Sequence, residues 1–346
     1  MVGPDGALPL PWLDAPLRQA LAASTAHALL IHGPAGIGQF ELALTLAQAW
    51  LCEAADASAA RPCGRCASCR LVQAHSHPDL LVLLPEALRE PLGWLFGEPD
   101  PAKKPSKDIR VDEVRAAVAF SQSTSARGRF KVVVLYPAER LNLVAANALL
   151  KTLEEPPGDT RLVLAGSAVD ALPATVRSRC HRVPIALPSA VQGAAWLAAE
   201  GIAQPEVLLA AAGGQPQQAL EWSRQGIDAA GWQRLPALVA QGSAAGFANW
   251  PLPRVVETLQ KLCHDALCVA AGAAPRYFPV ATIAAGADPG ALQAWRAELL
   301  RTARHVEHPW NAGLLLDALV QQGARALVRG AAKAPPRGTS SLHSAP

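Results

Sequence analysis

The sequence predicts an α/β domain whose parallel sheet is covered by helices on both faces, followed by an all-α C-terminal region. Three observations support this prediction. A glycine-rich turn at residues 33–38 separates a short apolar run from an amphipathic stretch. Further apolar runs alternate with helical patterns up to about residue 187, which is typical of a parallel sheet. Beyond residue 188 the strand signals stop, and Ala- and Leu-rich helical stretches broken by Gly and Pro follow.

The glycine-rich turn has the spacing of a phosphate-binding loop, G-x-x-x-x-G-K-[ST], with Gly33, Gly36 and Gly38 in place. The two chemically active positions differ from that motif. Gln39 stands where a lysine would neutralise phosphate, and Phe40 stands where a hydroxyl would bind magnesium. Backbone amides and the helix dipole could still attract an anion weakly. We expect neither tight binding nor hydrolysis of a nucleotide.

The remaining elements of the first domain follow in order. We expect helices over residues 12–27, 39–52, 112–122 and 142–155, and buried strands over residues 29–31, 80–84, 131–136, 161–165 and 182–186. Asp112 and Asn142 are the expected N-caps of their helices. Residues 85–107 are rich in Pro, Gly and charge, which predicts a surface loop.

Composition restricts the class of protein. The 346 residues allow two or three domains, and 51% hydrophobic residues supply a sizeable core. A net charge of +3 is too small to indicate nucleic-acid binding by itself. The N-terminus lacks the regions of a signal peptide, and no apolar run approaches the roughly 20 residues that span a bilayer. We therefore expect a soluble, cytoplasmic protein without membrane contacts.

Four of the seven cysteines lie in one stretch, which predicts a structural zinc site. Cys63, Cys66 and Cys69 form a Cys-x₂-Cys-x₂-Cys turn, and Cys52 at the end of the preceding helix can complete a tetrahedral shell. One alternative is that His75 or His77 replaces Cys52. Another is that the four thiols bind no metal.

Two motifs carry a resemblance to a known family. Residues 147–157, Asn-Ala-Leu-Leu-Lys-Thr-Leu-Glu-Glu-Pro-Pro, and the downstream Ser178-Arg179-Cys180 resemble the bacterial DNA polymerase III clamp-loader subunits. These proteins form an AAA+ assembly that opens the sliding clamp and places it on primed DNA. The resemblance extends from the phosphate-loop region to about residue 187, and more loosely through the helical remainder.

Within that family the sequence resembles most closely the delta-prime members, which do not hydrolyse ATP. Tyr136 and Pro137 occupy the positions where ATPase members carry Asp-Glu for magnesium and water. Gln217, in the segment 213–220, occupies the position of a phosphate-sensing arginine. Together with Gln39 and Phe40, these differences imply that the chain has no competent ATP or magnesium site of its own.

The resemblance assigns a role to Arg179. In the family, the arginine of the Ser-Arg-Cys motif projects into the ATP site of the neighbouring subunit. An arginine delivered in this way stabilises charge on the transferred phosphoryl group. The alternative is that Arg179, like Arg177 and Arg182, forms surface salt bridges only.

The resemblance also implies a domain plan and partners. We expect an AAA+ core over residues 1–187 containing the four-cysteine zinc module (52–69), a small helical lid over 188–226, a helical collar for oligomerisation over 227–332, and a disordered tail over 333–346. The partners would be the gamma or tau ATPase subunits and the delta subunit, with the clamp and primed DNA, within a DNA polymerase holoenzyme. The alternatives are an ATP-hydrolysing gamma/tau-type subunit and a zinc-bearing DNA-binding module.

Overall fold

The computed structural model describes residues 1–23, 26–54, 61–95, 104–305 and 311–328. The chain forms two compact units, one of residues 1–196 with 214–218 and one of residues 197–213 with the chain from 219 onward. The predicted boundaries at residues 187, 226 and 332 remain predictions. The predicted tail at 333–346 lies outside the described residues.

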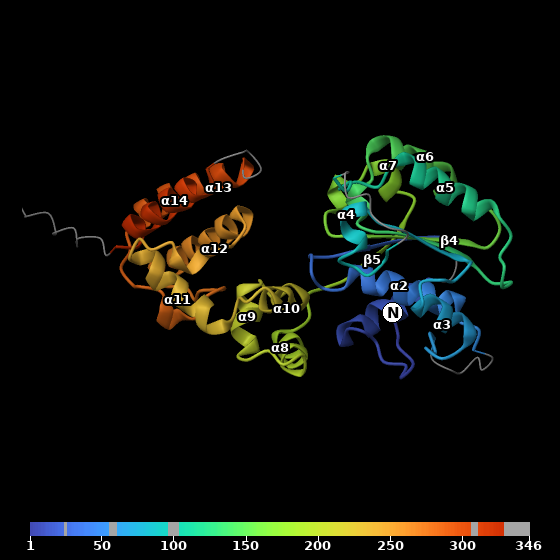
Figure 1. The fold of residues 1–346 in the computed structure, drawn as a ribbon, viewed down its shortest axis with the longest axis horizontal. Helices are drawn as coiled ribbons and strands as arrows, with labels where there is room; N and C mark the ends of the chain where they lie inside the picture. The colour runs from blue at the N-terminus through green and yellow to red at the C-terminus, as the bar shows by residue number, and fades with distance from the viewer. Residues whose placement is uncertain (24–25, 55–60, 96–103, 306–310, 329–346) are drawn as a thin grey trace, which may run out of the picture. The chain divides into compact units, whose positions relative to one another are not determined.

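The first unit is built on a five-stranded sheet of order β2-β3-β4-β1-β5, in which all four pairings are parallel (Figure 1). The strands are β1 (Ala28–His32), β2 (Leu80–Leu83), β3 (Lys131–Leu135), β4 (Thr160–Gly166) and β5 (His181–Pro184). Because parallel neighbours need a crossover connection, helices separate successive strands. The predicted α/β fold class is confirmed, with strand ends within two residues of the predicted ones.

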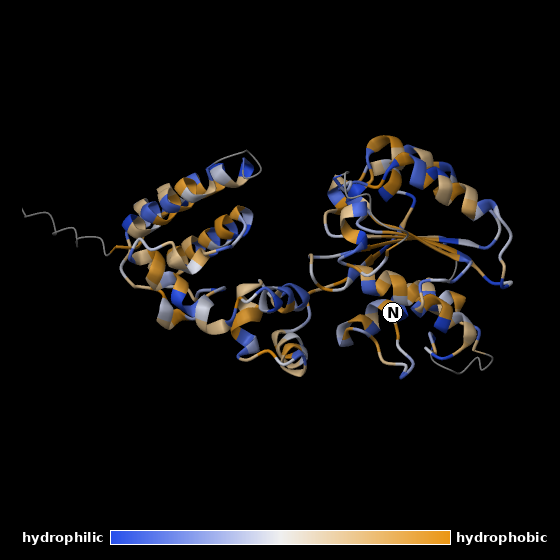
Figure 2. Cartoon of the chain, viewed as in Figure 1, coloured by the Kyte–Doolittle hydropathy of each residue, from blue (hydrophilic) through white to orange (hydrophobic). Residues whose placement is uncertain are grey.

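Helices cover both faces of the sheet. A helical turn η1 (Pro11–Leu13) leads into α1 (Asp14–Ala22), and α2 (Gln39–Leu51) follows β1. The other face carries α5 (Val111–Gln122), α6 (Leu143–Glu154) and α7 (Ala174–Arg177) (Figure 1). Leu29 and Ile31 of β1 pack toward α2, whereas Leu30 packs toward α5 and α6. This burial on both sides explains the unbroken apolar runs of the strands (Figure 2).

The two predicted helix caps have different outcomes. Asn142 caps α6, since its Oδ1 accepts a hydrogen bond from Ala145 N at 2.8 Å. The prediction for Asp112 is wrong, because the N-cap residue of α5 is Arg110, two positions earlier. Glu113 Oε2 accepts a hydrogen bond from Arg110 N at 2.7 Å, and this contact fixes the earlier start.

The prediction of a surface loop over residues 85–107 is wrong for its first part. Residues Glu86–Arg89 form the short helix α4, and Trp94 is only 3% exposed. Arg110 pairs with Glu86 at 3.0 Å, and Arg89 pairs with Glu113, so α4 is attached to the start of α5. Residues 96–103 lie outside the described part. The high Pro and Gly content of this stretch predicted a loop, although Trp94 within it is buried.

The second unit is helical in its described residues, as predicted. A connecting helix α8 (Ala190–Ala199) leads from the first unit. It is followed by α9 (Pro205–Ala211), α10 (Pro216–Arg224), α11 (Ala229–Ala240), α12 (Leu252–Ala270), α13 (Pro289–Arg304) and α14 (Ala312–Leu327). No described helix combines the length and the hydropathy needed to cross a membrane.

A buried carboxylate, Asp79, organises the start of β2 and β3. It is fully buried and accepts hydrogen bonds from Ala126 N (2.8 Å), Arg127 N (2.9 Å) and Ser125 Oγ (3.1 Å), with Lys131 Nζ at 3.4 Å. Burial alone would raise the pKa of Asp79, but these donors and Lys131 outweigh it and lower the pKa. The folded state therefore favours the ionised carboxylate.

We expect Asp79→Ala to lower the free energy of unfolding by about 3 kcal/mol at neutral pH, because buried amides lose their acceptor. Urea denaturation of the wild type, Asp79→Ala and the exposed control Asp159→Ala measures this, and the control should stay within about 0.5 kcal/mol of the wild type. Because the pKa of Asp79 is lower in the folded state, the ionised carboxylate stabilises the fold at pH values above its pKa in the unfolded chain. This stabilisation is lost as the pH falls through the pKa of the folded state. The gap between wild type and Asp79→Ala should therefore shrink in acid. An equal decrease in the free energy of unfolding for Asp79→Ala and Asp159→Ala would contradict the stabilising role of the buried Asp79 carboxylate.

Candidate functional site

The degenerate phosphate loop keeps its glycines because the protein packs tightly around them. A Cβ atom on Gly33 would lie 2.3 Å from the carbonyl oxygen of Ile185. Gly38 has φ of 102°, a left-handed conformation that favours glycine, and a Cβ there would lie 2.4 Å from Leu10 Cδ1. The turn between β1 and α2 therefore needs both glycines even without a nucleotide.

The side chain at the lysine position is turned into the loop itself. Gln39 is 3% exposed, and its Nε2 donates hydrogen bonds to the carbonyl oxygens of Gly33 (2.8 Å) and Pro34 (2.5 Å). The N-terminal segment closes the same turn, since Trp12 Nε1 donates to the Ile37 carbonyl at 2.8 Å. The carbonyl groups of Gly33, Pro34 and Ile37 are thus occupied by side chains, and the loop carries no lysine charge.

An aromatic cluster occupies the region where a magnesium ligand would be expected. Phe40 stacks on Tyr136 with ring centroids 5.0 Å apart, and the edge of Trp94 meets Phe40 at 6.2 Å. His75 stacks on Trp94 at 3.8 Å. Burial raises the pKa of Tyr136 to about 12, so its hydroxyl stays protonated at neutral pH. Because these groups lack a carboxylate, they are poor ligands for magnesium, which prefers oxygen anions.

The residue at the position of the phosphate-sensing arginine also contacts the loop. Gln217 Nε2 donates to Glu41 Oε1 of α2 at 2.6 Å, and Gln217 N lies 3.3 Å from the Gly36 carbonyl oxygen. A Cβ on Gly36 would lie 3.3 Å from the Cβ of Gln218. Residues 214–218 therefore pack directly on the loop, in the same compact unit.

Arg179 lies between α7 and β5 with its side chain 33% exposed. Its Nε donates to Glu154 Oε1 at 2.6 Å, Nη2 contacts the same oxygen, and Nη1 donates to the Thr175 carbonyl at 2.9 Å. The neighbouring Arg177 differs, since it pairs with Asp170 at 2.7 Å. The adjacent Cys180 is buried, and burial raises its pKa to about 12, so it remains a neutral packing residue.

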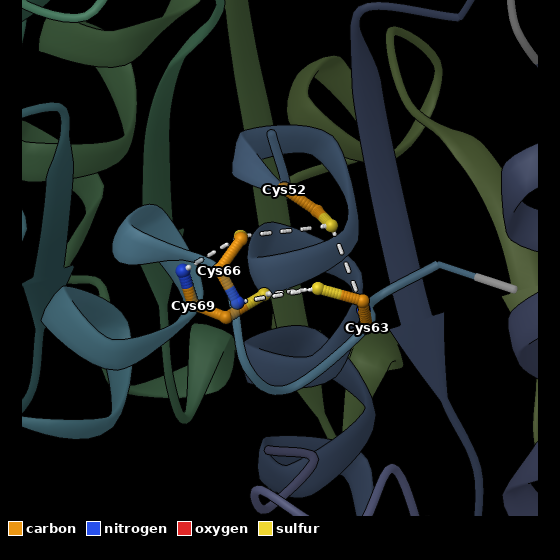
Figure 3. A group of neighbouring side chains, drawn as sticks. All are labelled: Cys52, Cys63, Cys66 and Cys69. Atoms are coloured by element: carbon orange, nitrogen blue, oxygen red, sulfur yellow. Dashed lines mark hydrogen bonds between the residues drawn. The ribbon is translucent and has the colours of Figure 1, made fainter. Parts of the chain in front are cut away.

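The four predicted cysteines lie together (Figure 3). Their sulfur atoms are all within 4.8 Å of one another, and the Cys63–Cys69 and Cys66–Cys52 pairs are 4.0 Å apart. A tetrahedral Zn²⁺ with Zn–S bonds of about 2.3 Å has sulfur atoms about 3.8 Å apart. The four thiols can therefore hold a metal of this kind with small adjustments.

Local backbone geometry positions the sulfur atoms and stabilises the thiolate of Cys63, whereas burial raises the pKa values of Cys52 and Cys69. Cys52 follows the last residue of α2, and Cys66 is the N-cap of α3 (Ala67–Gln73), where its Sγ accepts from Cys69 N at 3.4 Å. Glu53 N donates to Cys66 Sγ and Cys66 N to Cys63 Sγ, each at 3.4 Å. Burial raises the pKa of Cys63, but amide and thiol donors outweigh it and lower the pKa to about 6.

The histidine alternatives to Cys52 fit less well. His77 is buried with both ring nitrogens occupied, since Nε2 pairs with Ser68 Oγ at 2.9 Å and Nδ1 accepts from Asp79 N at 3.0 Å. His75 stacks on Trp94. Among the described residues, the four cysteines are the cluster of at least three His, Cys, Asp or Glu side chains that could share one ion.

Sequence reasoning missed two residues near the candidate sites. Glu154 received no role from the sequence, although it pairs with Arg179. Trp94 falls in the predicted loop 85–107, although it closes the aromatic cluster. The apolar triplet 94–96 in a polar stretch was the available signal for Trp94. No local pattern could indicate a contact between residues 154 and 179.

Comparisons with known proteins agree with the predicted resemblance. The delta' subunit of Pseudomonas aeruginosa DNA polymerase III is 42% identical over 222 residues, covering 63% of this chain and 62% of that protein. The Escherichia coli delta' subunit is 36% identical over 217 residues, covering 61% and 59%. The tau subunit of Salmonella typhimurium is 34% identical over 154 residues, covering 44% of this chain and 21% of that protein.

The chain spans about six tenths of the length of these two delta' relatives. The family described as DNA polymerase III, delta subunit, matches residues 16–189, which include the phosphate loop, the cysteine cluster and Arg179. The two delta' subunits are more similar to this chain than the tau subunit is, and the chain belongs to this DNA polymerase III subunit family.

Proposed function

We propose that this chain is a delta-prime-type subunit of an AAA+ clamp loader, supporting the loading of a sliding clamp onto primed DNA without hydrolysing ATP. The observation that carries the proposal is the filled phosphate loop. Gln39 bonds to the loop's own carbonyls, and Phe40 stacks on Tyr136. Membership of the DNA polymerase III family supplies the context.

The filled loop would oppose ATP hydrolysis in two ways. ATP brings a cluster of negative charge that loops of this class neutralise with a lysine and a bound magnesium ion. Neither Gln39 nor Phe40 can supply such a charge or ligand. A nucleotide would also have to displace the buried side chains of Gln39 and Phe40 and break the hydrogen bonds of the former. These costs argue against the alternative of a gamma/tau-type ATPase.

The chain would take part in ATP hydrolysis through Arg179, which would project into the ATP site of an adjacent gamma or tau subunit and stabilise charge on the transferred phosphoryl group. Its guanidinium is permanently charged, planar and partly exposed, which suits recognition of phosphate oxygens. The delta subunit would be a further partner, and the clamp and primed DNA would be contacted within the assembly. The mild net charge of +3 gives little support to an independent DNA-binding module.

The four cysteines would hold structural zinc. Four thiolates form a closed shell without an open coordination position, so the ion would stabilise the segment rather than take part in a reaction. Zinc would tie the end of α2 to the start of α3.

We expect the isolated chain to bind Mg-ATP more weakly than about 1 mM, as measured by calorimetry. The double variant Gln39→Lys/Phe40→Thr should remain inactive in hydrolysis, because Tyr136 and Pro137 still cannot hold the metal. A gamma- or tau-type subunit in the same assay is the positive control. Micromolar affinity or appreciable turnover by the wild-type chain would contradict the non-hydrolysing assignment.

We expect Arg179→Ala to leave the assembled loader intact but to lower its DNA-dependent ATPase and clamp-loading rates. Arginines supplied by a neighbouring protein raise the hydrolysis rate of the best-studied GTPases roughly 10³- to 10⁵-fold. Arg179 would act at one of the loader's ATP sites only. Arg179→Lys should recover little, since it lacks the planar fork. Arg182→Ala, an exposed arginine three residues away, is the matched control. Unchanged rates for Arg179→Ala would remove the finger hypothesis.

We expect the purified chain to contain about one zinc ion, as measured by elemental analysis. Cys66→Ser should lose most of the metal and lower the melting temperature, because three thiolates bind zinc less well and the turn loses its tie. Cys268→Ser, outside the cluster, should retain the metal. Less than half an equivalent in the wild-type protein would contradict a structural site.

A further inference from the structure

The guanidinium of Arg179 is held from two sides by its own chain. Glu154 Oε1 accepts from Nε at 2.6 Å and also from Nη2, while the Thr175 carbonyl accepts from Nη1 at 2.9 Å. The two acceptors come from different elements, since Glu154 is the last residue of α6 and Thr175 belongs to α7. The direction of the side chain is therefore set by the relative placement of two helices.

This arrangement leaves part of the fork free for another ligand. A guanidinium has five N–H donors. Three are engaged by Glu154 and Thr175, so two remain, one on each terminal nitrogen. Each of these N–H groups can donate a charge-assisted hydrogen bond to a phosphate or carboxylate oxygen. Arg179 is thus oriented without being fully occupied.

A contribution to folding stability does not explain the ion pair of Glu154 with Arg179. The Arg179 and Glu154 side chains are 33% and 47% exposed, and ion pairs at such positions contribute little to folding. A carboxylate in the last turn of a helix also interacts unfavourably with the helix dipole. Glu155 offers a direct comparison, because it is exposed and no ion pair is found for it within the described ranges.

We propose that Glu154 is a positioning residue that orients Arg179 toward the neighbouring subunit's nucleotide. This inference rests on the proposed function of Arg179. The hydrogen bonds to Glu154 and Thr175 restrict the rotamers of this long side chain before the subunits assemble, so less entropy is lost when the transition state forms. Glu154 itself touches neither nucleotide nor metal, and it acts through Arg179.

The test uses the loader reconstituted from this chain with its gamma- or tau-type and delta partners. The variants are Glu154→Ala, Glu154→Gln, Arg179→Ala, the double variant Arg179→Ala/Glu154→Ala and the matched control Glu155→Ala. We expect Glu154→Ala to lower kcat of the DNA-dependent ATPase at the affected site about 10-fold, since a misplaced group can cost up to about 100-fold. KM for ATP, assembly and melting temperature should be unchanged.

The other variants separate positioning from a structural role. Glu154→Gln keeps an acceptor for the same hydrogen bonds and should recover part of the rate, and Glu155→Ala should match the wild type. The double variant should be no slower than Arg179→Ala, because a residue acting through Arg179 has no effect once Arg179 is absent.

The outcomes distinguish the two proposals. A normal kcat for Glu154→Ala beside a lowered kcat for Arg179→Ala would overturn the role of Glu154 and leave the finger in place. A normal rate for Arg179→Ala would overturn both. A faster Glu154→Ala loader, a double variant slower than Arg179→Ala, or a failure of assembly with Glu154→Gln would each contradict positioning.

Discussion

The packing of Phe40 against Tyr136 is the interaction on which the architecture of the first unit depends. The two rings join the first turn of α2 to the end of β3, and Trp94 brings the segment after β2 to the same point. Phe40 and Trp94 belong to the hydrophobic core that contains α2, and Tyr136 packs against that core. The glycines remain because Ile185 and Leu10 pack against the turn, so retention of the loop geometry needs no phosphate as its cause.

The other residues considered as sites in the first unit, Arg179 and the four cysteines, lie at or near the ends of helices. Arg179 lies after α7, and the four thiols that could hold a metal lie at the end of α2 and around the start of α3. Each depends on helix ends rather than on the sheet, since Glu154 ends α6 and Cys66 caps α3. The parallel sheet sets where those helix ends lie, and the side chains at the ends determine what each site can bind.

Patterns within one segment could be predicted from the sequence, and contacts between distant segments could not. The strands were predictable because both of their faces are apolar, and the Asn142 cap and the cysteine cluster depend on short spacings. The start of α5 was mispredicted because the Glu113 side chain accepts a hydrogen bond from Arg110 N. This contact makes Arg110, rather than Asp112, the N-cap residue. Trp94 and Glu154 gain their roles from partners 54 and 25 positions away in the chain, respectively Phe40 and Arg179.

The contact between Gln217 and Glu41 has a consequence for how residues 214–218 behave. An arginine at position 217 would find its best partner in a nucleotide phosphate, so the placement of the segment would depend on whether a nucleotide is bound. Gln217 is neutral and instead donates to a carboxylate of the chain's own α2. The hydrogen bond between Gln217 N and the Gly36 carbonyl also needs no ligand. Within the described residues, these two hydrogen bonds hold the segment on the loop without a nucleotide.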